Sequence, residues 1–359
     1  MASKFKFTRV LPLFGIAALA LVACDKHEEQ HDAPVDAGAA PSKAAVDEPD
    51  LARAVASAEQ HGATSATGTA GGPPPTGIFA PGAADAAIAK GAPVTLAIGS
   101  EGSEPRVQLG PNAKSPSKRS GTIEIATQAD PRQGALPVLF ALSVETQKAK
   151  AEAEGNAPAG NVVVKVTGAT VNAPGVPADL SAAVGKLKGS RLDYQLEASG
   201  AGSNVRIDVP KTVDPVFREA VRSLGENLEV LALPFPNKPI GNGGFWMVTS
   251  RDTVMGLDVV VYRLVKVEKI EGTQVTLNVS TKRYAASSAF DVEGLPPDAP
   301  HTMGEFHGTT EGSLVYNLGD ALPRSGQLES VVAAALGSAD AKQRPTVQLQ
   351  TRAVVALPN

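Results

Sequence analysis

The chain has 359 residues, of which 43% are hydrophobic and 19% are charged, so it can bury a sizeable core and is long enough for two domains of ordinary size. Its formal net charge is −4, and only 4% of its residues are aromatic. An acidic chain has no excess of Lys and Arg with which to bind a phosphate backbone or anionic lipid headgroups. Composition therefore argues against binding to nucleic acid and against charge-driven binding to a membrane surface.

The first residues have the pattern of an export signal. Three basic residues precede an apolar run that starts near Val10 and is too short to span a bilayer. The run ends at the small residues Ala23 and Cys24, which is typical of a signal peptide, here residues 1–23.

The end of this run also carries a modification motif. Leu21, Val22, Ala23 and Cys24 resemble the lipobox of bacterial lipoproteins, in which the Cys thiol is acylated and the chain is cut before it. Cys24 is the only cysteine, so no disulfide competes for it. We expect a mature chain that begins at Cys24 and is held by lipid on the periplasmic side of the inner or outer membrane, with a net charge near −7 once the three cations are removed.

Residues 24–92 have the composition of a stem. They are rich in Ala, Gly, Pro, Ser and acidic residues and show no hydrophobic periodicity. Such a segment buries too little apolar surface to offset its conformational entropy, so we expect it to be disordered.

The rest of the chain consists of short β-branched runs on either side of one helical pattern. In residues 93–211, Leu192, Tyr194 and Leu196 alternate with polar residues, and residues 234–359 contain similar alternating runs. One buried and one wet face indicate antiparallel sheet. The similar runs Leu192–Leu196 and Leu314–Leu318, each centred on a Tyr, indicate that the two β units are related.

A helix is predicted over residues 212–233. Asp214 can cap it, Pro215 suits its first turn, and a stripe at helical spacing runs from Phe217 to Leu231. The predicted fold class is mainly β (α+β), with two related antiparallel β units joined by one amphipathic helix after the stem. The segment 327–336 fits either a helix or a strand.

Two stretches resemble a known family. Ser103-Glu104-Pro105-Arg106 and the Pro- and Gly-rich stretch from Pro234 to Trp246 are similar to those of a family of uncharacterised lipoproteins from deltaproteobacteria, over about residue 93 to the C-terminus. The resemblance implies a β-rich body and no particular activity. Similar lipoproteins of other envelopes are curved antiparallel sheets with a helix across one face, and some of them hold lipid; this link is an analogy of fold only.

Catalytic and metal motifs are weak. His27–His31 matches H-E-x-x-H of zinc hydrolases but lies in the predicted stem, without an apolar helix to hold the ligands. His301, Glu305 and His307 are close enough in sequence to share a metal ion, but three irregularly spaced ligands beside a Pro-rich loop are weak evidence for a site. Ser115–Lys118 matches S-x-x-K, but no helix signal follows it. Neither a phosphate-binding loop nor a dinucleotide fingerprint occurs, so we expect no cofactor, no metal and no enzymatic activity.

The sequence leaves two main roles open. The first is an interaction or scaffold role with an envelope protein, for which the body should be packed solid. The second is a carrier of a hydrophobic or lipid ligand, which needs an apolar cavity between curved sheet and helix. Aromatic residues that could line such a cavity, besides their ordinary role as core residues, are Trp246, Phe217, Tyr194 and Tyr316.

Overall fold

A computed structural model describes residues 74–111, 117–128, 134–148, 160–197, 199–254, 256–290, 301–337 and 345–358. The predicted signal peptide, the lipobox with Cys24, the His27–His31 motif and residues 24–73 of the predicted stem lie outside the described residues. So does the Pro-rich stretch within 291–300.

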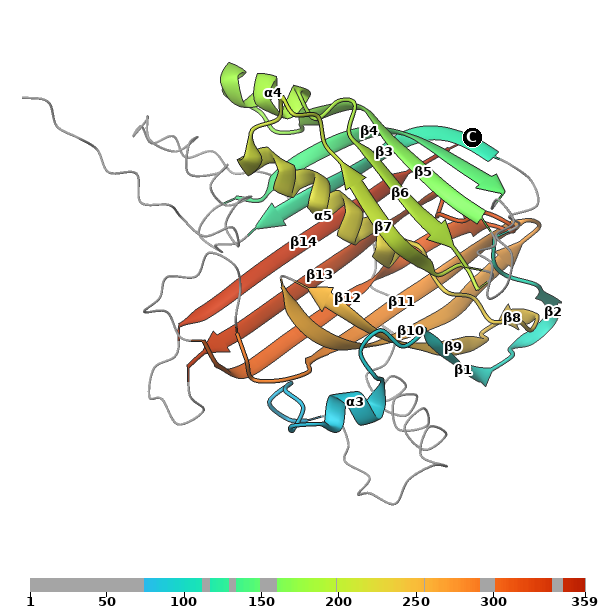
Figure 1. The fold of residues 1–359 in the computed structure, drawn as a ribbon. Helices are drawn as coiled ribbons and strands as arrows, with labels where there is room; N and C mark the ends of the chain where they lie inside the picture. The colour runs from blue at the N-terminus through green and yellow to red at the C-terminus, as the bar shows by residue number, and fades with distance from the viewer. Residues whose placement is uncertain are drawn as a thin grey trace, which may run out of the picture.

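The described part of the chain is mainly β, as predicted (Figure 1). Its strands are β1 (Thr95–Ser100), β2 (Ser103–Val107), β3 (Ser117–Gln128), β4 (Leu136–Lys148), β5 (Gly160–Val171), β6 (Arg191–Leu196), β7 (Gly202–Asp208), β8 (Ile240–Asn242), β9 (Phe245–Val254), β10 (Leu257–Glu271), β11 (Gln274–Ala285), β12 (Met303–Asn317), β13 (Ser325–Leu336) and β14 (Thr346–Ala356). Its helices are α3 (Ala83–Ala87), α4 (Ala178–Gly185) and α5 (Pro215–Leu231). None of these helices is both long and apolar enough to cross a bilayer.

Twelve of the strands form one antiparallel sheet in the order β1-β9-β10-β11-β12-β13-β14-β3-β4-β5-β6-β7. β3 to β7 and β9 to β14 are two meanders, and α5 connects them. They join because the last strand, β14, pairs with β3. β1 pairs with β9 at one end of the sheet, so the two predicted β units share a single sheet.

Helix α5 lies against one face of this sheet, called the inner face below (Figure 1). Its stripe is buried: Val221 and Leu224 are fully enclosed, and Leu228 is only 2% exposed. Gly225 allows a close approach, since a Cβ there would lie 3.0 Å from Ile207 of β7 and 3.3 Å from Leu192 of β6. The predicted amphipathic helix is confirmed, and its apolar side packs on the first meander.

The inner face changes from apolar to polar between two neighbouring rows of residues. The apolar row crosses the sheet through Trp246, Val265, Val279, Gly312, Leu328, Ala353 and Ile125. Two residues along each strand, the polar row is Arg263, Thr281, Thr310, Ser330, Thr351 and Thr127, with the apolar Val248 beside Arg263 on β9. Side chains two apart in a strand share a face, so both rows point toward the α5 side.

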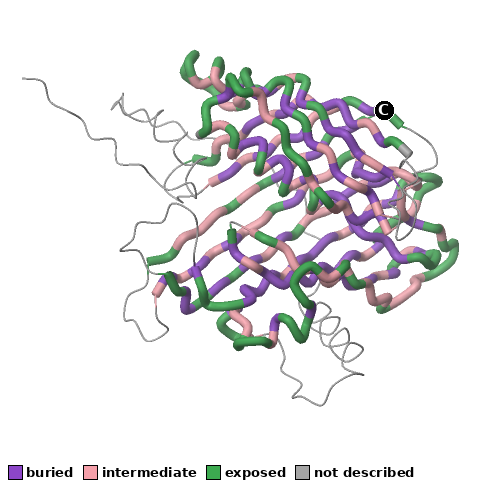
Figure 2. The backbone as a smooth tube through the Cα atoms, in the orientation of Figure 1, coloured by how far each residue is buried: buried purple, intermediate pink, exposed green. Residues whose placement is uncertain are grey.

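Beyond the polar row the inner face is apolar again. A separate cluster there includes Val259, Phe306 and Ala334. The main core and this cluster thus lie on either side of the polar row, which is called the polar belt below. Buried and less buried positions alternate along the strands of the sheet (Figure 2). A polar belt between two cores is the feature that positions the site below.

The folded part begins earlier than residue 93. In residues 74–92, called the N-terminal strap, the amide of Phe306 donates to the carbonyl of Thr76 at 2.9 Å, and Phe79 and Ala285 form a similar bond. Ala84 of α3 and Ile88 are buried against the outer face of β10 and β11. The end of the predicted stem is therefore part of the body, because its few apolar residues dock on the sheet.

Other segments settle an open prediction or were not predicted. The ambiguous segment 327–336 is strand, within β13. Ser103–Arg106 lies in β2, which pairs with β8 in a small second sheet. Helix α4 was not predicted from the sequence. Among the alternating runs of residues 234–359, β10 and β11 pair as an antiparallel hairpin.

Candidate functional site

The aromatic residues proposed to line a cavity lie in the main core or against it. Trp246 is fully buried and donates from Nε1 to the carbonyl of Pro234 at 3.0 Å. Tyr316 donates to the carbonyl of Leu231, and Tyr194 is 5% exposed. Phe217 is half-buried against the same core. None of the four is among the residues that line the cavity described next.

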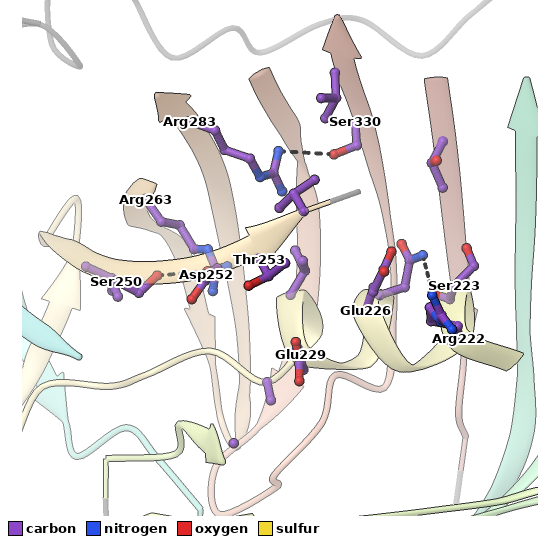
Figure 3. Close-up of a pocket in the computed structure, with 18 of the residues that line it drawn as sticks. Arg222, Ser223, Glu226, Glu229, Ser250, Asp252, Thr253, Arg263, Arg283 and Ser330 are labelled. Carbon is purple, nitrogen blue, oxygen red and sulfur yellow. Dashed lines mark hydrogen bonds between the residues drawn. The ribbon is translucent and has the colours of Figure 1, made fainter. Parts of the chain in front are cut away.

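The cavity lies between the polar side of α5 and the polar belt of the sheet (Figure 3). Its volume is about 300 Å³, at the lower end of the range for small-molecule pockets. Its charged lining residues are Arg222, Arg263, Arg283, Glu219, Glu226, Glu229 and Asp252. A cavity therefore exists beside the helix, as the carrier hypothesis requires, but its lining combines these charged residues with apolar ones such as Val230, Val248 and Val332.

Arg283 of β11 is held in place by the sheet. Its Nη1 donates to Thr310 Oγ1 at 2.7 Å and to the carbonyl of Thr309 at 3.3 Å, and Ser330 Oγ lies 3.4 Å away. The side chain points along the sheet toward Ser330 in Figure 3. Burial lowers the pKa of Arg283 to about 10, and the charge of Arg263 contributes to the lowering. At neutral pH this guanidinium is a fixed cation with a defined orientation.

Arg263 of β10 is buried without such a network. It is 6% exposed, and its Nε has no hydrogen-bond partner in the described part of the chain. Its neighbour across the ladder, Thr281, also has a buried hydroxyl without a partner. Burial lowers the pKa of Arg263, although Asp252 opposes this effect. A buried cation with an unused donor is costly unless an acceptor reaches it.

The acidic residues of the cavity come from α5 and β9. Glu226 and Glu229 line the cavity from the exposed side of α5. Desolvation by neighbouring protein raises the pKa of Glu226 to about 7 and raises that of Glu229 as well. On β9, Asp252 accepts from Ser250 Oγ at 2.9 Å.

These opposite charges share the cavity without pairing. Among the charged lining residues, all of them in the described chain, the ion pair within 4.0 Å is Arg222 with Glu219, at 3.4 Å. Neither Arg263 nor Arg283 forms an ion pair with Glu226, Glu229 or Asp252 within that distance in the described part of the chain. The arrangement can accept hydrogen bonds at one side and donate them at the other, so it suits a polar molecule.

Sequence reasoning missed these residues, although a signal was present. Arg263 follows Val259 and Val261 and precedes Val265 and Val267 at the same inward spacing. A charged residue in phase with buried apolar ones is either paired or functional. On β11, Arg283 likewise stands two residues after Thr281 and four after Val279, which are buried on the same face.

The weak catalytic motifs gain no support where the structure describes them. Glu305 and His307 are exposed on β12, and the described residues contain no group of three or more His, Cys, Asp or Glu side chains that could hold a metal ion. Lys118 of the S-x-x-K motif lies on β3 and forms an ion pair with Glu145 at 3.1 Å, while Ser115 lies outside the described residues.

A scan against protein-family models gives no match, and a search of curated proteins gives none either.

Proposed function

We propose that this chain is a cell-envelope lipoprotein without catalytic activity, tethered through Cys24, whose body binds a small polar molecule between α5 and the sheet. The tether is supported by the resemblance of residues 21–24 to a lipobox. The binding role is supported by one observation above all, a cavity of about 300 Å³ whose charged lining groups are largely unpaired.

Other roles are supported less well. A carrier of a hydrophobic ligand would need an apolar lining, whereas Arg263, Arg283 and Glu226 line this cavity. A zinc hydrolase would need converging ligands in the folded body. An interaction role with an envelope protein remains a second proposal, because β7 ends the sheet and carries Ile207, a large apolar side chain that is 37% exposed.

Native mass spectrometry of the full-length chain, extracted from its own membranes in mild detergent, tests the binding role. We expect a co-purified molecule of low mass in the wild type and its loss in Ser223→Trp, which places a large side chain in the cavity. Thr273→Trp, in the exposed turn between β10 and β11, is the matched control. Equal occupancy in both variants, or an empty wild type, contradicts the binding role.

The tether has a separate test. The intact mass of the membrane-extracted protein should show a diacyl or triacyl group on a chain that begins at Cys24, and Cys24→Ser should remove both the acyl mass and the cleavage. An unmodified thiol on a water-soluble chain contradicts the tether but leaves the cavity argument intact.

A further inference from the structure

The charges of the cavity point to a class of ligand, and this inference rests on the proposed binding role. In a purely structural ion-pair network, each buried cation lies against a carboxylate. Here Arg263 is almost fully buried and keeps an unused Nε donor, while Glu226 and Glu229 lie in the same cavity without a cation within 4.0 Å in the described chain. Both signs of charge are therefore present and neither is satisfied by the other.

Most of the unpaired charges of each sign come from one element, although α5 also carries Arg222, which is paired with Glu219, and the sheet also carries Asp252. The cations Arg263 and Arg283 belong to the sheet, and the acids Glu226 and Glu229 belong to the helix that covers it (Figure 3). A third acid, Asp252 on β9, already accepts from Ser250 Oγ. A ligand between sheet and helix can therefore meet a donor surface on one side and an acceptor surface on the other.

We propose that the cavity binds a small zwitterion, with its acidic group on the guanidinium of Arg263 and its ammonium group on Glu226 and Glu229. A carboxylate or a phosphate would accept from the guanidinium of Arg263, which lines the cavity, and Arg283 adds a second positive charge in the same lining. Hydrogen bonds to charged groups are the strong ones, and they gain strength where protein excludes water. A purely anionic ligand would make no use of the two glutamates, and a purely cationic one would leave the buried Arg263 without an acceptor.

Four small probes test this choice of charge. 4-Aminobutyrate, succinate and putrescine share a four-carbon chain and differ only in their terminal charges, and O-phosphoethanolamine replaces the carboxylate with a phosphate. Isothermal titration calorimetry of the full-length chain in detergent should show that at least one zwitterion binds about tenfold or more tightly than succinate and putrescine. The stronger of the two zwitterions identifies the acidic group.

Substitutions assign the contacts. Arg263→Gln should weaken the zwitterion by about tenfold or more, and Arg263→Lys, which keeps the charge, should recover part of that loss. Glu226→Gln should weaken 4-aminobutyrate more than succinate. Arg352→Gln is the control, because Arg352 is exposed on the opposite face of β14.

Three results overturn the proposal: tighter or equal binding of succinate or putrescine, binding that is unchanged by Arg263→Gln and Glu226→Gln, or no binding by any probe. If succinate alone binds and Ser223→Trp abolishes that binding, the zwitterion is rejected, but the cavity is still a binding site for a polar molecule. An empty cavity in the membrane-extracted protein would instead count against the binding role itself.

Discussion

Tyr316, near the C-terminal end of β12, donates its hydroxyl proton to the carbonyl of Leu231, the last residue of α5. The bond joins β12 of the second meander to the helix that packs on the first. Tyr194 of β6 is equally enclosed, but its hydroxyl has no partner in the described part of the chain. Burial raises the pKa of both tyrosines above the ordinary value, so both hydroxyls stay protonated.

These two tyrosines give a matched test of the helix anchor. Tyr316→Phe should lower the free energy of unfolding by about 1–2 kcal/mol, because it leaves the Leu231 carbonyl without that donor. Tyr194→Phe removes a buried hydroxyl without a bond and should be neutral or stabilising. Urea unfolding of the full-length chain in detergent measures both values, and equal losses would contradict the role given to the Tyr316 bond.

The N-terminal strap can be tested at one glycine. A Cβ on Gly77 would lie 1.8 Å from the carbonyl oxygen of Phe306, so Gly77→Ala should detach residues 74–79 from the sheet. Gly82 has a similar positive φ, 79° against 72°, but nothing lies within 4 Å of its Cβ position, so Gly82→Ala should cost only about 1 kcal/mol of backbone strain.

Hydrogen exchange reads out this difference. The amide of Phe306, which donates to Thr76, should lose protection in Gly77→Ala and keep it in Gly82→Ala. If Phe306 stays protected in both variants, the strap is not held as described.

A second matched pair concerns buried charge outside the cavity. Arg119 is 7% exposed and donates to Asp320 Oδ2 at 3.3 Å and to the carbonyl of Leu322 at 3.0 Å. Asp320→Ala should cost about 3–5 kcal/mol, because it leaves a buried cation without its carboxylate. Glu271→Ala breaks an exposed pair with Lys269 and should cost at most about 1 kcal/mol. Similar losses in the two variants would contradict this assignment.

The pKa of Glu226 predicts how stability changes with pH. This pKa is raised to about 7 by enclosure, from an ordinary value of 4.5, so the folded chain binds a proton there that the unfolded chain has lost. The free energy of unfolding should therefore fall as pH rises from about 4.5 to about 7. Glu226→Gln should remove this part of the pH dependence, as measured by urea unfolding between pH 4 and pH 8.

Glu145 supplies a control of opposite sign. Its pKa is lowered by a hydrogen bond from Lys118, so its contribution to stability is lost as pH falls through the acid range. Glu145→Gln should leave the dependence between pH 5 and pH 7 unchanged. A Glu226→Gln profile parallel to the wild type would show that the cavity does not enclose this carboxyl.

Several elements of the fold could be predicted because local chemistry determines them. The stripe from Phe217 to Leu231 and the caps around it define α5, and the alternation after Val259 defines the β10–β11 hairpin. Alternation tells which side of a strand is buried but not which strand lies beside it. The joining of β14 to β3 and of β1 to β9, which makes a single sheet, therefore had no local signal.

The residues of the cavity were not predicted. An apolar cavity between sheet and helix was what the carrier hypothesis required, and four aromatic residues were expected to line it. Trp246 and Tyr316 instead use their polar atoms on Pro234 and Leu231 and fill the core. Arg263 held the better signal, because a cation at an inward strand position must find a partner or serve a ligand.

The most direct measurement is an NMR titration of the arginine side chains. The ¹⁵Nε–¹Hε signals of Arg263 and Arg352, assigned with Arg→Lys variants, are followed while 4-aminobutyrate or O-phosphoethanolamine is added to the full-length chain in detergent. We predict a saturable shift of the Arg263 signal and none of the Arg352 signal, since the Arg263 side chain lines the cavity and Arg352 does not. An Arg263 signal that does not move, or that moves together with Arg352, would contradict a ligand site in this cavity.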